Sequence, residues 1–344
     1  MLGQDTMTGR PISFGYNVPT FAGAPETGNE PTHVNVPVYA ELDWEVTKRG
    51  IRAAEELGFD SIWAPDHLLL GVNQAEYEVW TLLSAIAGMT DRPRIGSLVL
   101  CNDFRSPALV AKMAATLDVI SDGRLTLGLG AGWHEPEYLT YGWPFRADFD
   151  RLMRLDESIR LIKRMWTEDA PSFEGDHYRI TDAACEPKPI QSPHPPILVG
   201  GAGEEVTLKI VARHADVWNT TSFGGAIPTL ERKLAVLSAH CNTVDRSVED
   251  IEQSWESLIL CTRDEALEEK VASRLLPRAG PAGDRIESRE DLRTYVPFGT
   301  PEECITAIKQ RVELGITTFQ FWFLDYPSHR GMELFADEVA PAFQ

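Results

Sequence analysis

Three alternating glycines, Gly128, Gly130 and Gly132, stand in the stretch RLTLGLGAGWHEPEY at residues 124–138. Glycine has no Cβ, so a strand that carries it lets another chain or a flat ligand approach its backbone closely. The dinucleotide fingerprint G-x-G-x-x-G uses this property to hold a pyrophosphate. Here Trp133 occupies the position of the third glycine and Pro136 follows, so no tight helix is expected to begin there. Two interpretations stay open: a strand end against which a ligand lies, and glycines required only by the curvature of a barrel.

A second group of small residues, Gly200, Gly201, Ala202 and Gly203, follows an apolar run in PILVGGAGEEV at residues 196–206. Small residues expose successive backbone N–H groups, and a helix that begins after them favours an anion at its N-terminus. The pattern predicts a turn that binds phosphate. The alternative is an ordinary tight turn between a strand and a helix, which needs fewer glycines.

Asp66 and His67 end the stretch FDSIWAPDH, where an expected strand stops. Histidine changes its charge near neutral pH and is therefore suited to proton transfer. We expect a catalytic pair in which Asp66 fixes the tautomer of His67 or the loop beside it. The alternative is a capping aspartate next to a histidine without a role.

Asn219 ends another expected strand, DVWNT, at a place where its amide can hydrogen-bond a ligand. Trp218 precedes it and is expected in a substrate pocket, together with Trp133 and His134 as a roof. The alternative for Trp218 and Asn219 is a packed tryptophan followed by a turn asparagine.

The elements that must position these residues alternate along the chain. Short apolar runs and segments with helical periodicity follow one another about eight times, which is typical of parallel strands buried on both faces. Eight such units favour an α/β fold of the (β/α)8 TIM-barrel type over an open doubly wound sheet, as one domain over residues 1–344. A minimal barrel needs ~250 residues, so insertions are expected in the loops at the C-terminal face. The irregular segments are residues 20–41, 133–148, 170–196 and 277–297.

Composition excludes several classes of protein. The net charge is −20, with 52 acidic against 32 basic residues, which argues against nucleic acid as a partner. No run of ~18 apolar residues predicts a membrane span, and no apolar leader follows the first methionine, so we expect a cytoplasmic protein. The five cysteines are scattered and the histidines lack metal-ligand spacing, which predicts reduced thiols and no metal site.

The sequence resembles the bacterial luciferase-like superfamily over nearly its whole length. The resemblance rests on residues 97–145 (SLVLCNDFRSPALVAKMAATLDVISDGRLTLGLGAGWHEPEYLTYGWPF) and 195–219 (PPILVGGAGEEVTLKIVARHADVWN). FDSIWAPDH, FGTPEE and GITTFQFW agree in order and spacing. The resemblance implies a (β/α)8 barrel that binds FMN or the deazaflavin coenzyme F-420 at the C-terminal ends of its strands.

The resemblance also implies roles for single residues. It places the cofactor phosphate at the glycine turn of residues 200–203, and His67 beside the ring, where it acts as a base in some deazaflavin members. It implies a non-proline cis peptide, or a bulge, between Leu98 and Val99 that supports the ring. Cys101 is then either a contact of the ring edge or an inert core thiol. The branch that oxidises hexose phosphates carries a glutamate where this chain has Trp133, so an apolar or aromatic substrate is expected instead.

Three functions remain open from the sequence. The first is hydride transfer between coenzyme F-420 and a small organic substrate. The second is an FMNH2-dependent two-component monooxygenase that inserts one oxygen atom from O2, and the third is a non-catalytic flavin-binding protein. No NADPH fingerprint is present, so a separate flavin or deazaflavin reductase is expected to supply electrons. A homodimer is expected to form through the helix that contains AKMAATLDVI, residues 111–120.

Overall fold

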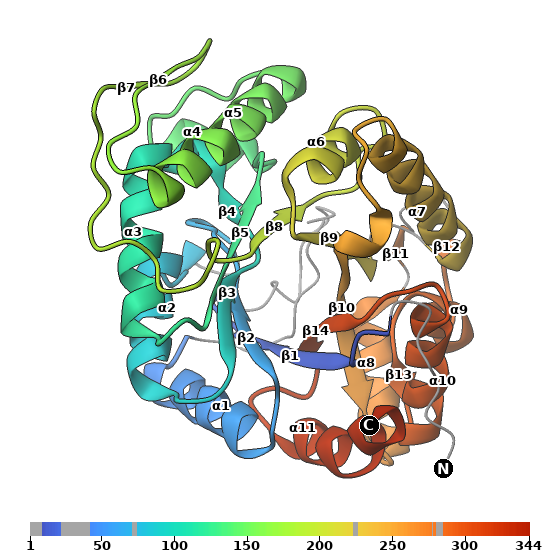
Figure 1. Ribbon diagram of the computed structural model, residues 1–344. Coiled ribbons are helices and arrows are strands. Elements are labelled where there is room, and N and C mark those ends of the chain that lie inside the picture. Colours follow the sequence, from blue (N-terminus) through green and yellow to red (C-terminus); the bar gives the residue numbers. More distant parts are fainter. Residues whose placement is uncertain (1–8, 22–41, 71–73, 223–225, 277, 280–284) are drawn as a thin grey trace.

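A closed barrel of parallel strands forms the centre of the protein, as the computed structural model shows for residues 9–21, 42–70, 74–222, 226–276, 278–279 and 285–344 (Figure 1). Eight strand positions close the barrel, and β9 and β10 pair to complete the ring. In chain order they are β1 (Ser13–Asn17), β2 (Ser61–Ala64), β3 (Arg94–Ser97) continued by β4 (Leu100–Cys101), β5 (Leu125–Gly130), β8 (Ile197–Gly200), β9 (Val217–Thr221), β10 (Glu252–Cys261) and β14 (Thr318–Phe323). The expected (β/α)8 TIM barrel is therefore confirmed.

Helices surround the barrel on its outside (Figure 1). They are α1 (Trp44–Glu56), α2 (Val79–Met89), α3 (Pro107–Ile120), α5 (Asp148–Thr167), α6 (Thr207–His214), α7 (Ile227–Asn242), α8 (Glu265–Leu275), α10 (Pro301–Val312) and α11 (Arg330–Leu334). Side chains fix where several begin: Asp43 accepts a hydrogen bond from the Val46 amide at the start of α1, and Thr300 and Glu303 form a capping box at α10. Among the described residues, no helix is long and apolar enough to cross a bilayer.

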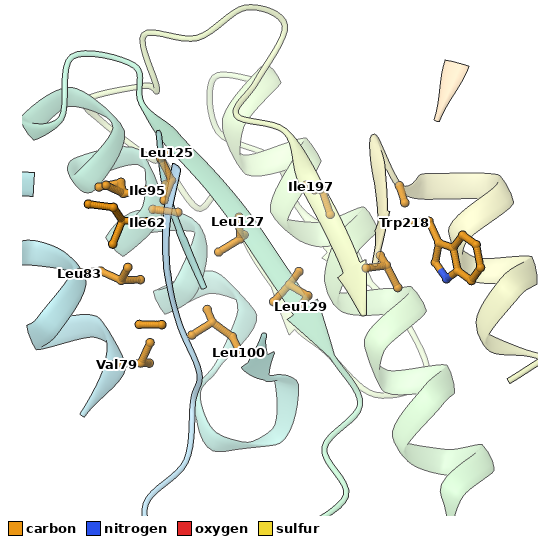
Figure 2. Packing of buried hydrophobic residues seen from close by; sticks show 14 of the residues in the cluster. Ile62, Val79, Leu83, Ile95, Leu100, Leu125, Leu127, Leu129, Ile197 and Trp218 are labelled. Carbon is orange, nitrogen blue, oxygen red and sulfur yellow. The ribbon is translucent and has the colours of Figure 1, made fainter. Parts of the chain in front are cut away.

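The two faces of strand β5 have different surroundings, the helices on one side and the barrel interior on the other. Its leucines Leu125, Leu127 and Leu129 are buried in the core between the barrel and the helices, as Figure 2 shows. Because side chains alternate along a strand, Gly128 and Gly130 face the barrel interior instead. The apolar side chains of β5 thus pack against the helices, and the glycines leave room inside the barrel for the neighbouring strand.

The loops differ in part from the expectation. A short helix, α4 (Glu135–Thr140), begins just after the glycines, because Pro136 lies in its first turn, where no amide hydrogen is needed. Residues 277–297 were expected to be irregular but contain α9 (Arg289–Tyr295), which Ser288 caps, and the strands β11 (Arg278–Ala279) and β12 (Arg285–Ile286). Of the 20–41 insertion, residues 22–41 lie outside the described part of the chain.

Residues 170–196 connect the end of α5 to β8 and carry a hairpin of β6 (Phe173–Glu174) and β7 (Arg179–Ile180). The hairpin packs on α5, since the His177 and Tyr178 amides donate to the Glu157 carboxylate at 2.9 and 3.0 Å. The Tyr178 hydroxyl also accepts a hydrogen bond from Asn102 Nδ2, after β4, at 3.1 Å. The insertion thereby approaches the C-terminal face, although it starts from the opposite one. The remaining short elements are β13 (Phe298–Gly299), which pairs with β10, and the helical turns η2 (Asn102–Phe104), η4 (Val248–Asp250), η5 (Phe335–Val339) and η6 (Ala340–Phe343).

Candidate active site

A cavity of about 440 Å³ opens at the C-terminal ends of the barrel strands. This is the end at which parallel barrels carry their sites, and the volume lies within the range of small-molecule pockets. The cavity brings together most of the residues singled out in the sequence, namely Asp66, His67, Leu98, Val99, Cys101, Gly130, Gly132, Trp133, His134, Gly200, Gly201 and Asn219. Ala202, Gly203 and Trp218 are not part of its described lining.

The alternating glycines make room for the neighbouring strand. A Cβ on Gly128 would lie 2.0 Å from the Ser97 carbonyl oxygen, and one on Gly130 would lie 2.6 Å from Val99 Cγ2. Gly200, on the other side, would bring a Cβ within 2.9 Å of Val99 Cγ1. Glycine is therefore required at these positions by close packing around Ser97–Val99, and Gly130 and Gly200 expose backbone to the cavity as well.

The peptide bond between Leu98 and Val99 is cis, at the position that the resemblance implied. It separates β3 from β4, which together occupy one strand position of the barrel. Hydrogen bonds hold the segment: the Leu98 amide donates to the Ala64 carbonyl at 2.8 Å, and the Ser97 hydroxyl donates to the Gly128 carbonyl at 2.8 Å. Leu98 and Val99 thus form part of the cavity wall between β2 and β5.

His67 is oriented by a glutamate that the sequence reading did not assign. Its Nδ1 lies 3.0 Å from Oε2 of Glu137, in α4, and the other carboxylate oxygen accepts hydrogen bonds from the Leu68 and Leu69 amides. Burial acts to raise the pKa of Glu137, but the hydrogen bond from His67, the charge of His67 and the two amides together lower it. Because an ionised carboxylate only accepts, Nδ1 of His67 carries the hydrogen and Nε2 of the neutral ring is left as a base.

Asp66 has a different partner from the expected one. Arg105 donates to both of its carboxylate oxygens, at 2.6 and 3.0 Å, and the Cys101 amide donates at 2.9 Å. Arg105 also reaches Glu78 at 2.6 Å. Asp66 therefore ties the end of β2 to the segment after β4, while Glu137 orients the histidine.

Trp133 and His134 lie beside His67, with ring centroids 5.6 and 6.4 Å from that of the imidazole. The Trp133 ring is 45% exposed, which leaves apolar surface at the cavity available to cover a ligand. Burial lowers the pKa of His134, which favours its neutral form beside His67. The two residues line the cavity as expected.

Trp218 does not face the cavity and packs in the core between the barrel and the helices (Figure 2). Its indole Nε1 donates to the Gly201 carbonyl at 2.8 Å, so it supports the glycine turn from behind. Asn219 lines the cavity, but its Nδ2 already lies within 3.1 Å of Ser254 Oγ and 3.2 Å of Gln320 Oε1. The packed-tryptophan alternative describes Trp218 better than the substrate pocket does.

Cys101 contacts the Tyr138 hydroxyl, with its sulfur 3.0 Å from that oxygen. Burial raises the pKa of Cys101 to about 12. The residue remains a thiol near neutral pH, which argues against a nucleophilic role. All five cysteines, each of which lies in the described part of the chain, are buried and unpaired.

The glycine turn differs from a simple helix start. Gly201 has φ +126°, a conformation that L side chains rarely adopt, and α6 begins only at Thr207, which lines the cavity. Lys233 of α7 (Ile227–Asn242) donates to the Ala202 carbonyl at 2.7 Å and so places a cation beside the turn. The sequence reading missed this lysine, because nothing in the chain separates it from other helix lysines.

Two more cavity residues were missed, Glu256 of β10 and Trp322 of β14. A signal was present for Glu256, since it is an acidic residue in the middle of the apolar strand QSWESLIL. Glu137 was visible in HEPEY, but its reach to His67 depends on the fold of residues 131–140. Such contacts between distant segments cannot be derived from spacing.

A closed parallel barrel has its cavity at the carboxyl ends of the strands, and glycine backbone and a histidine–carboxylate pair line that cavity. This arrangement is typical of barrel enzymes. The family model of the luciferase-like monooxygenases matches residues 12–318. The chain therefore belongs to the luciferase-like monooxygenase family and is an oxidoreductase.

Similar proteins include enzymes named as F420-dependent and enzymes named as FMNH(2)-dependent. An F420-dependent glucose-6-phosphate dehydrogenase from Amycolatopsis mediterranei is 29% identical, over 84% of this chain and 91% of that protein. An FMNH(2)-dependent dimethylsulfone monooxygenase from Pseudomonas putida is 31% identical over 56% of this chain and 52% of its own length. A solved F420-dependent secondary alcohol dehydrogenase superposes with a TM-score of 0.75 at 20% identity, covering 97% of this chain and 100% of that one. At that identity the superposition establishes the fold.

Proposed function

We propose that this protein is an F-420-dependent oxidoreductase that transfers a hydride between the deazaflavin and a small organic substrate. The observation that carries the proposal is the His67–Glu137 pair at the edge of a glycine-walled cavity. Relatives named as F420-dependent dehydrogenases, matched over more than four fifths of this chain, support the deazaflavin over FMN.

The residues present fit a flat ring with a phosphate-bearing tail. Gly130, Gly132, Gly200 and Gly201 line the cavity, so a flat ring would lie against backbone there. Lys233 stands behind the adjacent turn and adds positive charge where a phosphate would lie. When bound, a deazaflavin supplies a carbon that accepts or donates a hydride.

The residues of this chain would exchange the proton, position the histidine and exclude water. His67 exchanges a proton at Nε2, while Glu137 holds Nδ1 and stabilises the imidazolium. Asp66 and Arg105 fix the strand end that carries His67. Trp133 and His134 cover the open side and exclude water from the bound ligand.

The described lining suggests a substrate without a phosphate. None of the described lining residues is a lysine or arginine, whereas Asp66, Glu137 and Glu256 are acidic. An anionic substrate would therefore find no lysine or arginine on the described lining to hold its charge. Although several relatives are named as glucose-6-phosphate dehydrogenases, we therefore propose a neutral substrate with an apolar or aromatic body.

The second candidate function is an FMNH2-dependent monooxygenase, which the dimethylsulfone monooxygenase match supports. The monooxygenase would need a separate reductase as partner, and the deazaflavin enzyme would need one when it reduces its substrate. The third alternative, a non-catalytic flavin-binding protein, does not agree with the membership of this chain in an oxidoreductase family.

An anaerobic titration of the purified protein with oxidised coenzyme F-420 and, separately, with FMN tests the proposal. Ligand binding is read from quenching of tryptophan fluorescence, to which the cavity residue Trp133 contributes. Micromolar binding of the deazaflavin with much weaker binding of FMN is the expected result. Preference for FMN would instead favour the monooxygenase.

We further propose a cytoplasmic homodimer formed through α3 (Pro107–Ile120), the helix expected from the sequence. Its apolar residues Leu109, Val119 and Ile120 are 52, 40 and 57% exposed. Apolar side chains gathered on one outer helix favour a protein–protein contact. Size-exclusion chromatography with light scattering that finds only monomer would contradict the dimer.

A further inference from the structure

Glu256 stands in the middle of β10, a strand that otherwise carries mostly apolar and small side chains. Its neighbour Trp255 points outward, where Arg311 of α10 lies 4.8 Å over the indole ring. Side chains alternate along a strand, so Glu256 faces the barrel interior, and it lines the cavity. The carboxyl group thus lies deep in the protein with its accessible part directed toward the ligand space.

The surroundings of Glu256 provide one hydrogen bond and no ion pair among the described residues. Trp322 Nε1 donates to its Oε1 at 2.7 Å. The residues in register on the neighbouring strands, Thr221 of β9 and Gln320 of β14, are uncharged. His67, when protonated, is the group whose charge acts on Glu256. The other ionisable groups on the cavity wall are Asp66, Cys101, His134, Glu137 and Tyr138.

Glu256 is half-buried, and a carboxylate with one hydrogen-bond donor at such a site is poorly stabilised in its charged form. Burial accordingly raises the pKa of Glu256 to about 7, against the opposing effects of the Trp322 hydrogen bond and the His67 charge. Both protonation states are therefore populated near neutral pH, which is the property of an efficient general acid or base.

A purely structural role would be to hold the Trp322 indole. A glutamine or a serine would accept that hydrogen bond without the cost of burying an ionisable group. The carboxyl also keeps one oxygen beyond the Trp322 contact, on a wall of the ligand cavity.

We propose that Glu256 is a catalytic residue that exchanges a proton with the hydroxyl or carbonyl oxygen of the substrate. This inference rests on the proposed hydride-transfer function and narrows its substrates to neutral alcohols and the matching aldehydes or ketones. Oxidation of an alcohol by the deazaflavin involves two proton transfers: one proton leaves the substrate oxygen, and another joins the cofactor ring. Glu256 serves the substrate, and the His67–Glu137 pair serves the ring.

In the oxidative direction the alcohol C–H bond breaks and its hydrogen leaves with the electron pair to the oxidised deazaflavin, which is thereby reduced. The O–H bond of the hydroxyl group on that carbon also breaks. Its proton joins the Glu256 carboxylate, and its electron pair forms the second bond of the C=O group. In the reductive direction the protonated Glu256 returns the proton as the hydride adds to carbon. The His67–Glu137 pair would give the ring a proton in the oxidative direction and would take that proton back in the reductive direction.

The first test uses the protein without cofactor or substrate, so that its result does not depend on the proposed function. Infrared difference spectroscopy follows the C=O stretch of protonated carboxyl groups across the pH range in wild type, Glu256→Gln and Glu252→Gln. Glutamine keeps the size of Glu256 and still accepts the hydrogen bond from Trp322. Glu252, at the start of the same strand, is the matched control. A band that disappears with a midpoint near pH 7 in wild type and Glu252→Gln, and is missing in Glu256→Gln, is expected. The same band in all three proteins would overturn the inference.

The second test measures deazaflavin binding and turnover with cyclohexanol and benzyl alcohol as probes. Glu256→Gln is expected to keep the deazaflavin Kd, to lower kcat by about 100-fold with a smaller change in KM, and to lose the pH dependence near 7. Wild type that does not bind the deazaflavin would contradict the proposed function, whereas the infrared result would stand. Normal binding with an unchanged kcat and pH profile in Glu256→Gln would overturn the inference on Glu256.

Discussion

Nδ1 of His67 lies 3.0 Å from Oε2 of Glu137, a residue seventy positions further along the chain. The contact joins the loop after β2 to α4 (Glu135–Thr140), and the carboxylate is fixed by two further amides. One carboxylate therefore sets both the tautomer of the histidine and the path of the loop that carries it.

Glu137→Gln is expected to lower the rate of hydride transfer by on the order of 10-fold or more, because the imidazolium loses its charged partner. The deazaflavin Kd should change little, since Glu137 acts through His67. Single-turnover kinetics after binding measures both quantities. His67→Ala should lower the rate by about 100-fold or more, and Glu135→Gln, in the same short helix, is the matched control. Equal losses of rate and cofactor affinity in His67→Ala would contradict the proton-transfer role.

Gly128→Ala is expected to destabilise the protein by about 3 kcal/mol or more, since the new Cβ would overlap a backbone carbonyl that cannot move aside easily. The overlapping atom is the Ser97 oxygen, 2.0 Å away. Gly88→Ala, in α2 (Val79–Met89), is the control, because no atom lies within 4 Å of its Cβ. That change should stabilise the protein by about 1 kcal/mol. Urea unfolding measures both, and a mild effect at Gly128 would contradict close packing as the reason for glycine.

The barrel followed from periodicity, because short apolar runs that alternate with amphipathic helices have few other ways to bury both faces. The glycines and His67 were recognisable since their residue types are unusual at strand ends. Trp218 was misplaced because a strand-end tryptophan can face inward or outward, and one position of register decides between them. Glu137 was missed for a related reason: its contact with His67 depends on how α4 folds after Pro136.

Lys233→Met is expected to weaken deazaflavin binding several-fold, on the order of 1 kcal/mol, because a cation is lost beside the turn that would hold the phosphate. Lys233 lies 2.7 Å from the Ala202 carbonyl oxygen. Fluorescence titrations with FMN and with riboflavin, which lacks the phosphate, separate charge from packing. Binding of FMN should weaken and that of riboflavin should not. Lys209→Met, on the exposed side of α6, is the control, and equal losses for both ligands would contradict a phosphate contact.

Glu76→Gln is expected to remove part of the pH dependence of stability. Burial raises the pKa of Glu76 from 4.5 to about 9, although the Thr20 hydroxyl donates to it at 2.5 Å. The folded protein therefore binds a proton that the unfolded chain releases above pH 4.5. By linkage this contribution to the free energy of unfolding is complete below pH 4.5 and is lost as pH rises toward about 9.

Urea unfolding at pH 5 and pH 9 should show wild type losing about 5 kcal/mol more than Glu76→Gln over this interval, at about 1.4 kcal/mol per unit of pKa difference. Glutamine keeps an acceptor for Thr20 and carries no proton to release. Glu56→Gln, on the exposed side of α1, should follow the wild-type curve. Parallel curves for wild type and Glu76→Gln would mean that Glu76 is ionised in the folded protein. An ionised Glu76 would add a fourth negative charge near the cavity to those of Asp66, Glu137 and Glu256. Binding of an anionic deazaflavin tail would then weaken above neutral pH.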